Sequence, residues 1–259
     1  MPDRIRLDGR IAVVTGAAGV IGTATMRLLA ERGARIVAVD RKPQDLQTAV
    51  RDLPTSAQAL AITADVTSED EVAEYVRTAV DKFGTIDVFY NNAGIEGDVA
   101  PITRYSLEMF RKVIDVNVVG VFLGLKHVLP VMLKQNKGSI INTASIAGLI
   151  GSPEVAVYSA SKHAVIGLTK SAAQECSATG VRVNCVCPGL IDSRMLSAII
   201  EGRNPGNTPV PNDKIVERIP ARRLGLASEV ASIVAFLASD DASYVSGAAY
   251  TVDGGRTAA

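Results

Sequence analysis

The chain alternates short apolar runs rich in β-branched residues with longer segments of helical period, and this alternation constrains the fold most. The predicted strands are apolar on both faces or nearly so, as buried parallel strands are. They cover residues 11–15, 36–40, 59–63, 88–91, 139–143 and 181–186, with a late extra strand at 248–252. Helices are predicted between them at 21–32, 69–83, 106–135 and 157–179. We therefore predict one α/β domain over residues 1–259, with a doubly wound, mostly parallel sheet of about seven strands and ligands beyond the carboxyl ends of the strands.

Charge and hydropathy narrow the classes of partner. Lys and Arg total 27, Asp and Glu also total 27, and the formal net charge is zero. Nothing in this balance predicts binding to nucleic acid or to an anionic membrane surface. The longest charge-free apolar run, residues 116–125, is too short to span a bilayer, and the N-terminus has no apolar h-region. We expect a cytoplasmic protein that acts on a small molecule.

The three cysteines predict neither a disulfide framework nor a metal site. Cys185 and Cys187 alternate on a predicted strand, so they point to the same face. No nearby histidine or further cysteine completes a metal site. Redox or metal pairing of these two thiols is the alternative, and burial as small apolar side chains is the preferred interpretation.

The stretch TGAAGVIG, residues 15–22, is a glycine-rich turn between a predicted strand and a predicted helix. That context is the one a dinucleotide fingerprint requires, and it predicts a Rossmann-type domain. Gly16, Gly19 and Gly22 allow an unusual dihedral angle and a close approach of the pyrophosphate to the backbone. Val20 is β-branched and resists a positive φ, so we predict that Gly19 supplies the positive φ while Val20 begins the helix. The backbone N–H groups of Val20 and Ile21 would then face the phosphate.

Asp40 ends the second predicted strand, at the expected distance after the turn. A carboxylate there accepts hydrogen bonds from the adenosine ribose hydroxyls and repels the additional phosphate of NADP. The glycine turn contains no lysine or arginine to hold that phosphate. Arg41, directly after Asp40, is the one residue that favours NADP, and we predict NAD as the cofactor.

Further motifs follow the turn in a fixed order along nearly the whole chain. They are Asp65-Val66, NNAG at 91–94, Asn117, Ser145, YSASK at 158–162, Pro188-Gly189 and VDGG at 252–255. Together the set resembles the short-chain dehydrogenase/reductase family. The family pattern in the turn is TGxxxGIG, so this chain departs from it, with Gly19 one place early and Val20 at the middle-glycine position. Because backbone N–H groups hold the phosphate, and Val20 and Ile21 also possess them, we expect cofactor binding to survive this change.

The resemblance implies a role for each matching residue at the cofactor. Asp65 and Val66 would contact the adenine, and Asn92, Ala93 and Gly94 would line the ribose side. The nicotinamide end would be held by Pro188, Gly189, Ile191 and Ser193, and the nicotinamide ribose by Tyr158 and Lys162. The resemblance also implies a homotetramer, with the long helices at 106–135 and 157–179 as candidate subunit contacts.

Tyr158 and Lys162 lie four residues apart on a predicted helix, so both occupy one face of it. Tyrosine has an ordinary pKa near ~10, and a nearby ammonium group favours the phenolate. Ser145 follows a central strand and could hold the substrate oxygen beside Tyr158. Asn117 lies in an apolar helix, and the resemblance implies that it orders a water linked to Lys162. These four residues predict hydride transfer, with Tyr158 exchanging a proton with the substrate oxygen and Ser145 stabilising that oxygen.

The predicted substrate is an apolar or cyclic secondary alcohol or ketone. Residues 190–222 are predicted to form a lid, because 202–213 is irregular and rich in proline and glycine. Glu96 and Met195 are predicted to contact the substrate, although Glu96 facing solvent is an equal alternative. Two other functions stay open at this point: an NADP-dependent ketone reductase and a catalytically silent nucleotide-binding protein.

Overall fold

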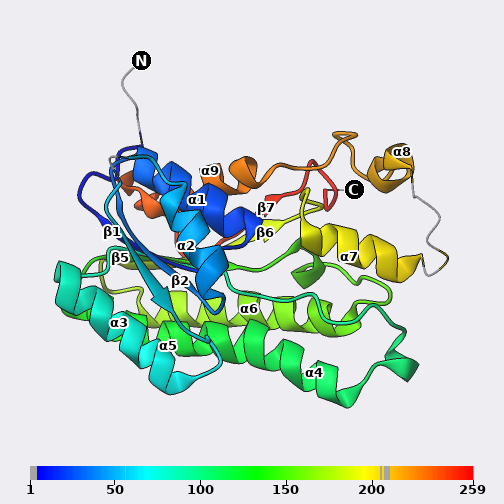
Figure 1. Cartoon of the computed structure of the whole chain (residues 1–259), viewed down its shortest axis with the longest axis horizontal. Coiled ribbons are helices and arrows are strands. Elements are labelled where there is room, and N and C mark those ends of the chain that lie inside the picture. Colours follow the sequence, from blue (N-terminus) through cyan, green and yellow to red (C-terminus); the bar gives the residue numbers. More distant parts are fainter. Residues whose placement is uncertain (1–4, 56, 205, 207–210, 259) are drawn as a thin grey trace.

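The computed structural model describes residues 5–55, 57–204, 206 and 211–258, and its centre is one parallel sheet (Figure 1). Seven strands pair side by side in the order β3-β2-β1-β4-β5-β6-β7, and each described pair is parallel. The strands are β1 (Ile11–Thr15), β2 (Arg35–Asp40), β3 (Ala59–Thr63), β4 (Val88–Asn91), β5 (Gly138–Thr143), β6 (Val181–Pro188) and β7 (Ala249–Val252). The order reverses beside β1, as in a doubly wound fold. The predicted fold class is confirmed.

Helices cover both faces of the sheet (Figure 1). On one face lie α1 (Val20–Glu31), α2 (Pro43–Arg51) and α9 (Ala227–Ala238). On the other lie α3 (Glu69–Phe83), α4 (Leu107–Ile114), α5 (Gly120–Lys134) and α6 (Ala156–Glu175). Two further helices, α7 (Arg194–Arg203) and α8 (Asn212–Val216), follow β6.

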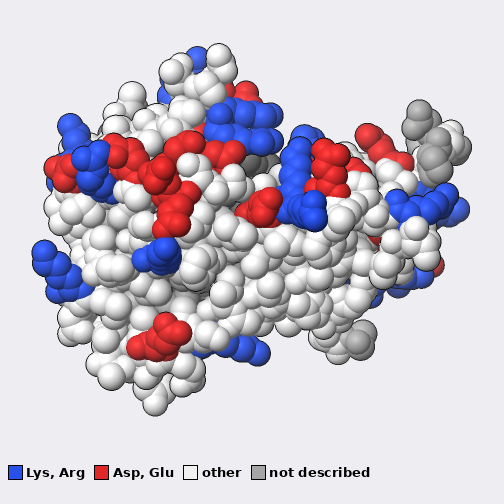
Figure 2. Space-filling model, turned by 90° about the horizontal axis from the view of Figure 1, so that it is seen from below, with Lys and Arg blue, Asp and Glu red and all other residues white. Residues whose placement is uncertain are grey.

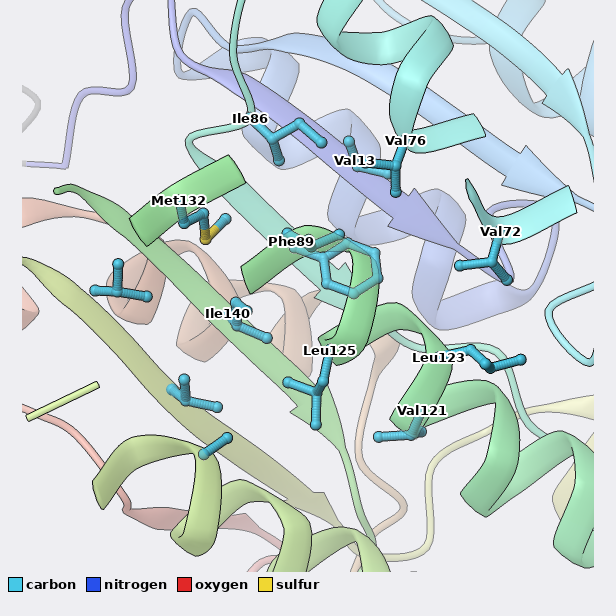
Figure 3. Close-up of a cluster of buried hydrophobic side chains, with 14 of the residues drawn as sticks. Val13, Val72, Val76, Ile86, Phe89, Val121, Leu123, Leu125, Met132 and Ile140 are labelled. Atoms are coloured by element: carbon cyan, nitrogen blue, oxygen red, sulfur yellow. The ribbon is translucent and has the colours of Figure 1, made fainter. Parts of the chain in front are cut away.

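The hydrophobic core between the sheet and α3, α5 and α6 is centred on Phe89 of β4 (Figure 3). Val13 and Ile140 flank Phe89 on the neighbouring strands, and α5 packs over its ring. Gly124 makes this approach possible, because a Cβ there would lie 2.8 Å from atoms of the Phe89 ring. Burial of one such side chain stabilises the fold by roughly 1.5–3 kcal/mol. The strands are therefore fixed by apolar packing on both faces, with their carboxyl ends left free.

Several predicted elements have the bounds that the sequence indicated, and others were missed. The helix at 69–83 and the strand at 88–91 are confirmed residue for residue. The long helix predicted at 106–135 is present as α4 and α5, joined without a break by a π-helical turn, Asp115–Val119. The sequence reading missed α2, α7, α8 and α9. Of these, α7 and α8 lie within the segment 190–222 predicted as a lid, parts of which (205 and 207–210) fall outside the described residues.

The glycine turn corrects one prediction. The positive φ belongs to Gly16, at +62°, whereas Gly19 has an extended backbone with φ −73° and ψ 159°. Gly19 is the N-cap of α1, and Val20 is the first residue of that helix, as predicted. Gly16 also has no room for a side chain, because an added Cβ would lie 2.9 Å from the Ala93 Cα in the loop after β4. Gly22 allows α1 to pack on this turn, since a Cβ there would lie 2.2 Å from the Gly16 carbonyl oxygen.

Substitution of the two glycines should separate their roles. We expect Gly16→Ala to lower the free energy of unfolding by about 2 kcal/mol or more, because it combines a left-handed backbone with a collision against Ala93. Gly19→Ala is the matched control, with an ordinary φ and only the Gly16 oxygen within reach, at 3.2 Å. It should cost about 0.5–1 kcal/mol, the difference between glycine and alanine as an N-cap. Equal losses in chemical denaturation would contradict this assignment of the turn.

Candidate functional site

The candidate site lies where the carboxyl ends of neighbouring strands meet. The turn after β1, the NNAG segment after β4, Ser145 after β5 and Pro188 at the end of β6 all reach the same edge of the sheet. Asp40 ends β2 beside the turn. In doubly wound sheets this edge binds ligands at the point where the strand order reverses. The sequence motifs that are far apart in the chain are therefore brought together.

Asn92 joins three of these strand ends through its side chain. Its Nδ2 donates to the carbonyl oxygens of Thr15 and Gly16, at 3.0 and 3.3 Å. Its Oδ1 accepts from the Thr143 hydroxyl at 3.2 Å, and its backbone N–H donates to the Thr15 hydroxyl at 2.9 Å. This amide thereby fixes the glycine turn relative to the ends of β4 and β5. Its position favours a role in shaping the cofactor cradle.

The start of α1 is suited to hold a pyrophosphate. No side chain caps this helix at Gly19, so the N–H groups of Val20 and Ile21 in its first turn are left for an anion. The Asp40 carboxylate accepts from the backbone N–H groups of Ala18 and Lys42, at 3.0 and 3.2 Å. Asp40 therefore shapes the turn as well as presenting a negative charge where an adenosine ribose would bind. These residues fit a dinucleotide.

Beyond Asp40 a groove of about 440 Å³ continues the cradle. Asp65 and the exposed Arg41 line this groove, together with Arg111 and Lys112 of α4.

The Asp65 carboxylate accepts from the N–H and the hydroxyl of Thr67, at 2.9 and 2.8 Å. Asp65 does not cap α3, because Ser68 is the N-cap of that helix. Its neighbour Val66 is buried against Gly120 at the start of α5.

Lys162 and Tyr158 lie together on α6, as their spacing predicts. The Lys162 ammonium nitrogen is 5.6 Å from the centre of the Tyr158 ring and donates to the Thr143 carbonyl oxygen at 2.8 Å. Lys162 is only 3% exposed, and this burial lowers its pKa to about 8. Thr143 was not among the predicted site residues, because a backbone carbonyl leaves no sequence signal.

Ser145 connects Tyr158 to the end of β6. Its hydroxyl donates to the Pro188 carbonyl oxygen at 3.4 Å and accepts from the Ala147 N–H at 3.1 Å. Burial raises the pKa of Tyr158 to about 12, and the nearby Ser145 hydroxyl opposes that rise. The predicted bias toward phenolate is therefore outweighed by burial. At neutral pH the phenol is protonated and can donate to an acceptor oxygen.

Asn117 lies in the π-helical turn between α4 and α5. Its amide is fully buried, accepts from the Ile95 N–H at 2.8 Å, and donates to the Ile95 carbonyl at 2.9 Å and the Ser161 hydroxyl at 3.0 Å. Single π-helical turns occur frequently at functional sites. A Cβ on Gly94 would lie 3.3 Å from both the Asn117 Oδ1 and the Lys162 Nζ, so Gly94 leaves space between these groups. The structure thus brings Asn117 to the same site as Lys162.

The segment after β6 returns across the strand ends and leads into α7. The Gly189 N–H donates to the Val252 carbonyl at 3.0 Å, and Ile191 bridges Gly225. Ser193 is the N-cap of α7, since its hydroxyl accepts from the Leu196 N–H at 3.2 Å. Met195 follows in the first turn of this helix and is half-buried. These residues lie in the order that the sequence predicted for the nicotinamide end.

Glu96 has a partner that the sequence reading missed. Both carboxylate oxygens accept from the Arg194 guanidinium, at 2.7 and 3.1 Å. The Glu96 side chain is 12% exposed, so it does not simply face solvent. The two cysteines predicted to share a face, Cys185 and Cys187, are both free thiols and both buried. Among the described residues no group of three or more His, Cys, Asp or Glu side chains could hold a metal ion.

Comparison with known proteins agrees with this geometry. The family model described as "Enoyl-(Acyl carrier protein) reductase" matches residues 16–257. Levodione reductase of Leifsonia aquatica is 39% identical over 257 residues, covering 98% of this chain and 96% of that protein. Cyclohexanol dehydrogenase of Acinetobacter sp. is 39% identical over 253 residues, covering 97% and 96%. Cis-4-hydroxycyclohexanecarboxylate dehydrogenase of Sinomonas cyclohexanicum is 43% identical over 251 residues, covering 96% and 97%.

Solved structures give the same result. The crystal structure of levodione reductase superposes with a TM-score of 0.95 at 38% identity, covering 98% of this chain and 100% of that one. NAD⁺-bound xylitol dehydrogenase gives 0.91 at 37% identity, covering 96% and 99%. An actinorhodin polyketide ketoreductase with NADPH gives 0.91 at 35%, covering 95% and 97%. The sheet, the strand-end site and these likenesses define an oxidoreductase with a nicotinamide cofactor. The chain belongs to the short-chain dehydrogenase/reductase family.

The buried lysine should leave a pH signature in stability. The pKa of Lys162 is about 8 in the folded protein and near ~10.4 when unfolded, so the unfolded chain binds more protons between these values. Relative to Lys162→Met, the free energy of unfolding of the wild type should therefore rise by roughly 1–3 kcal/mol between pH 7 and 10. Chemical denaturation at a series of pH values measures this difference. Lys170→Met, at an exposed position of α6, is the control and should show no such trend. A flat difference for Lys162→Met would contradict the assigned burial.

Proposed function

We propose that this protein transfers a hydride between NAD and a secondary alcohol or ketone that is apolar or cyclic. The observation that carries the proposal is the joint placement of Ser145, Tyr158 and Lys162 at the strand ends beside the glycine turn. A catalytically silent nucleotide-binding protein would need the turn but not these three side chains. The arrangement therefore favours an enzyme.

Each residue has a defined task in this proposal. The nicotinamide, when bound, supplies or accepts the hydride. Tyr158 moves the proton at the substrate oxygen: its phenol donates in ketone reduction and its phenolate accepts in alcohol oxidation. Ser145 stabilises that oxygen as its charge changes. Lys162 places a positive charge beside Tyr158 and would contact the nicotinamide ribose, and Asn117 would support a water that connects Lys162 with solvent.

The remaining predicted residues bind the cofactor. Asp40 would accept the adenosine ribose hydroxyls, Arg41 would lie beside them, and Asp65 and Val66 would border the adenine. The pyrophosphate and ribose side would be held by Gly16, Gly19, Val20, Ile21, Gly22, Asn92, Ala93 and Gly94. The nicotinamide would be held by Pro188, Gly189, Ile191 and Ser193. We favour NAD because Asp40 is already fixed by two backbone N–H groups and would repel a 2′-phosphate.

The substrate class is supported by the relatives and by the lining of the site. Cyclohexanol dehydrogenase and cis-4-hydroxycyclohexanecarboxylate dehydrogenase act, by their names, on alcohols of six-membered rings. In this chain Leu149 and Ile150 expose apolar surface after Ser145, and Met195 lies on α7. We infer that Glu96 and Met195 border the substrate and that residues 190–222 close over it, within one domain formed by residues 1–259.

The long helices support a homotetramer as part of the proposal. Leu107, Phe110, Phe122 and Leu133 expose large apolar side chains along α4 and α5. Figure 2 looks onto the helices at the bottom of Figure 1 and shows a broad area there with few charged side chains. The stretch Leu107–Lys134 is long and apolar enough to cross a membrane, but 44% of its most apolar window is buried inside the fold. We infer that second copies cover this face in a cytoplasmic enzyme, and light scattering that gives a monomer would refute the tetramer.

A screen of cyclic and acyclic secondary alcohols and ketones, followed by nicotinamide absorbance with NAD and NADP, tests the function. We expect turnover with cyclic substrates, preference for NAD, and loss of turnover in Tyr158→Phe. Firm NAD binding without turnover of any substrate would favour the silent nucleotide-binding protein instead. A wild-type preference for NADP would show that Arg41 dominates and that the cofactor assignment is wrong.

The role of Asp40 has its own matched pair of variants. Asp40→Ala should reduce the preference for NAD over NADP in kcat/KM by about tenfold or more, mainly through weaker use of NAD. Asp40→Asn removes the charge but retains an acceptor for the Ala18 N–H, so it separates repulsion of the phosphate from support of the turn. Unchanged cofactor preference in both variants would contradict the proposed selectivity.

A further inference from the structure

Helix α7 rests on the two loops that border the site, and an arginine holds each of its ends. Arg194, its first residue, forms the two hydrogen bonds to Glu96 in the loop after β4. Arg203, its last residue, donates to the Ser152 hydroxyl at 3.1 Å and the Pro153 carbonyl at 2.8 Å. The helix therefore spans from the loop after β4 to the loop before α6.

The position of Arg194 within α7 is not explained by helix stability. A cation at the first helical residue faces the positive end of the helix dipole, which is unfavourable. The first turn of α7 contains no acidic residue of its own, and Ser193 already caps it. The carboxylate that suits this helix end comes instead from Glu96, in a different part of the chain. The contact with Glu96 is therefore the function of the guanidinium.

Glu96 needs the ion pair more than Arg194 does, because its side chain is the more buried of the two. The side chain of Glu96 is 12% exposed, whereas that of Arg194 is 75% exposed. A carboxylate removed from water is costly when its charge is unpaired. Glu96 also acts on the active-site tyrosine, because its negative charge raises the pKa of Tyr158. Loss of Arg194 would leave the charge of this largely buried carboxylate uncompensated.

We propose that Arg194 is a positioning residue for hydride transfer, which acts through Glu96 by holding the first turn of α7 over the site and by neutralising a carboxylate whose charge acts on Tyr158. This inference rests on the proposed function. It separates two effects of one ion pair: attachment of α7, which substrate binding requires, and the charge environment of Tyr158, which proton transfer requires. Arg203 contributes only to the first effect, because it does not contact Glu96.

The groups that face Tyr158 come from four places in the fold. Lys162 lies on the same helix, the Cys187 thiol lies on β6, the Ser145 hydroxyl follows β5, and Glu96 reaches in from the loop after β4. Among the described residues, Glu96 is the one carboxylate whose charge raises the pKa of Tyr158. A change in the charge of Glu96 should therefore appear in the titration of Tyr158.

The first test is the pH profile of kcat/KM for alcohol oxidation. In Arg194→Gln we expect the rising limb, which reports formation of the phenolate, to move to higher pH by about 0.5–1 unit. Arg194→Lys should keep most of the wild-type profile, because it retains the charge. The double variant Glu96→Gln/Arg194→Gln should return the limb to the wild-type position or below, while KM remains raised. Arg203→Gln is the matched control and should raise KM without moving the limb.

The second test does not require activity. Hydrogen exchange in the free protein should be at least about fivefold faster in the first turn of α7 for Arg194→Gln and for Glu96→Gln, and the double variant should exchange no faster than either. Arg203→Gln should accelerate only the last turn. Unchanged exchange in Arg194→Gln, or an active enzyme whose pH profile does not move in that variant, would overturn the inference and leave the proposed function intact. A wild-type protein inactive on all substrates would instead refute the proposed function, and the exchange experiment would still decide whether the ion pair holds α7.

Discussion

The hydrogen bonds of Asn92 are the interaction on which the rest of the site depends. Its side-chain amide joins the glycine turn after β1 to the ends of β4 and β5. Thr143 at the end of β5 donates its hydroxyl to this amide and accepts from the Lys162 ammonium group through its carbonyl oxygen. Because these strands are parallel and buried on both faces, their carboxyl ends cannot shift independently. The glycine turn and Lys162 are therefore placed by one continuous set of contacts.

Burial of ionisable side chains in the site disfavours their charged forms, which opposes the stability of the fold. Burial lowers the pKa of Lys162 to about 8 and raises that of Tyr158 to about 12, so each group is displaced away from its charged form. Such displacement is typical of groups that exchange protons in a reaction. Ser145 and Glu96 act on the Tyr158 pKa in opposite directions, since the Ser145 hydroxyl lowers it and the Glu96 charge raises it. At neutral pH the Tyr158 phenol is protonated.

The sequence was sufficient to predict the sheet, since apolar strands depend on local pattern, and its ordered motifs selected residues that the structure brings to one edge of that sheet. The helix at 69–83 has strong period, acidic residues in its first turn and a serine cap, so its bounds were correct. The positive φ of the turn was assigned to Gly19 and not to Gly16, because the close contact that requires a glycine at position 16 is made by Ala93, far along the chain. Helix α7 was missed because its two end residues, Arg194 and Arg203, are held by partners on loops that are distant in the sequence. The effect of Lys162 on Tyr158 was misjudged because burial is a property of the packed structure.

The central claim is that these strand ends form one site for hydride transfer with Tyr158 as the proton-transfer group. Incubation with NAD⁺ and a secondary cyclic alcohol carrying deuterium on the carbinol carbon tests it most directly, with the nicotinamide examined by NMR. The account predicts that deuterium appears on the nicotinamide ring with the wild type and not with Tyr158→Phe, while both proteins bind the cofactor. Deuterium transfer at equal rates by the two proteins, or none by a wild type that binds NAD⁺ and the alcohol, would contradict it.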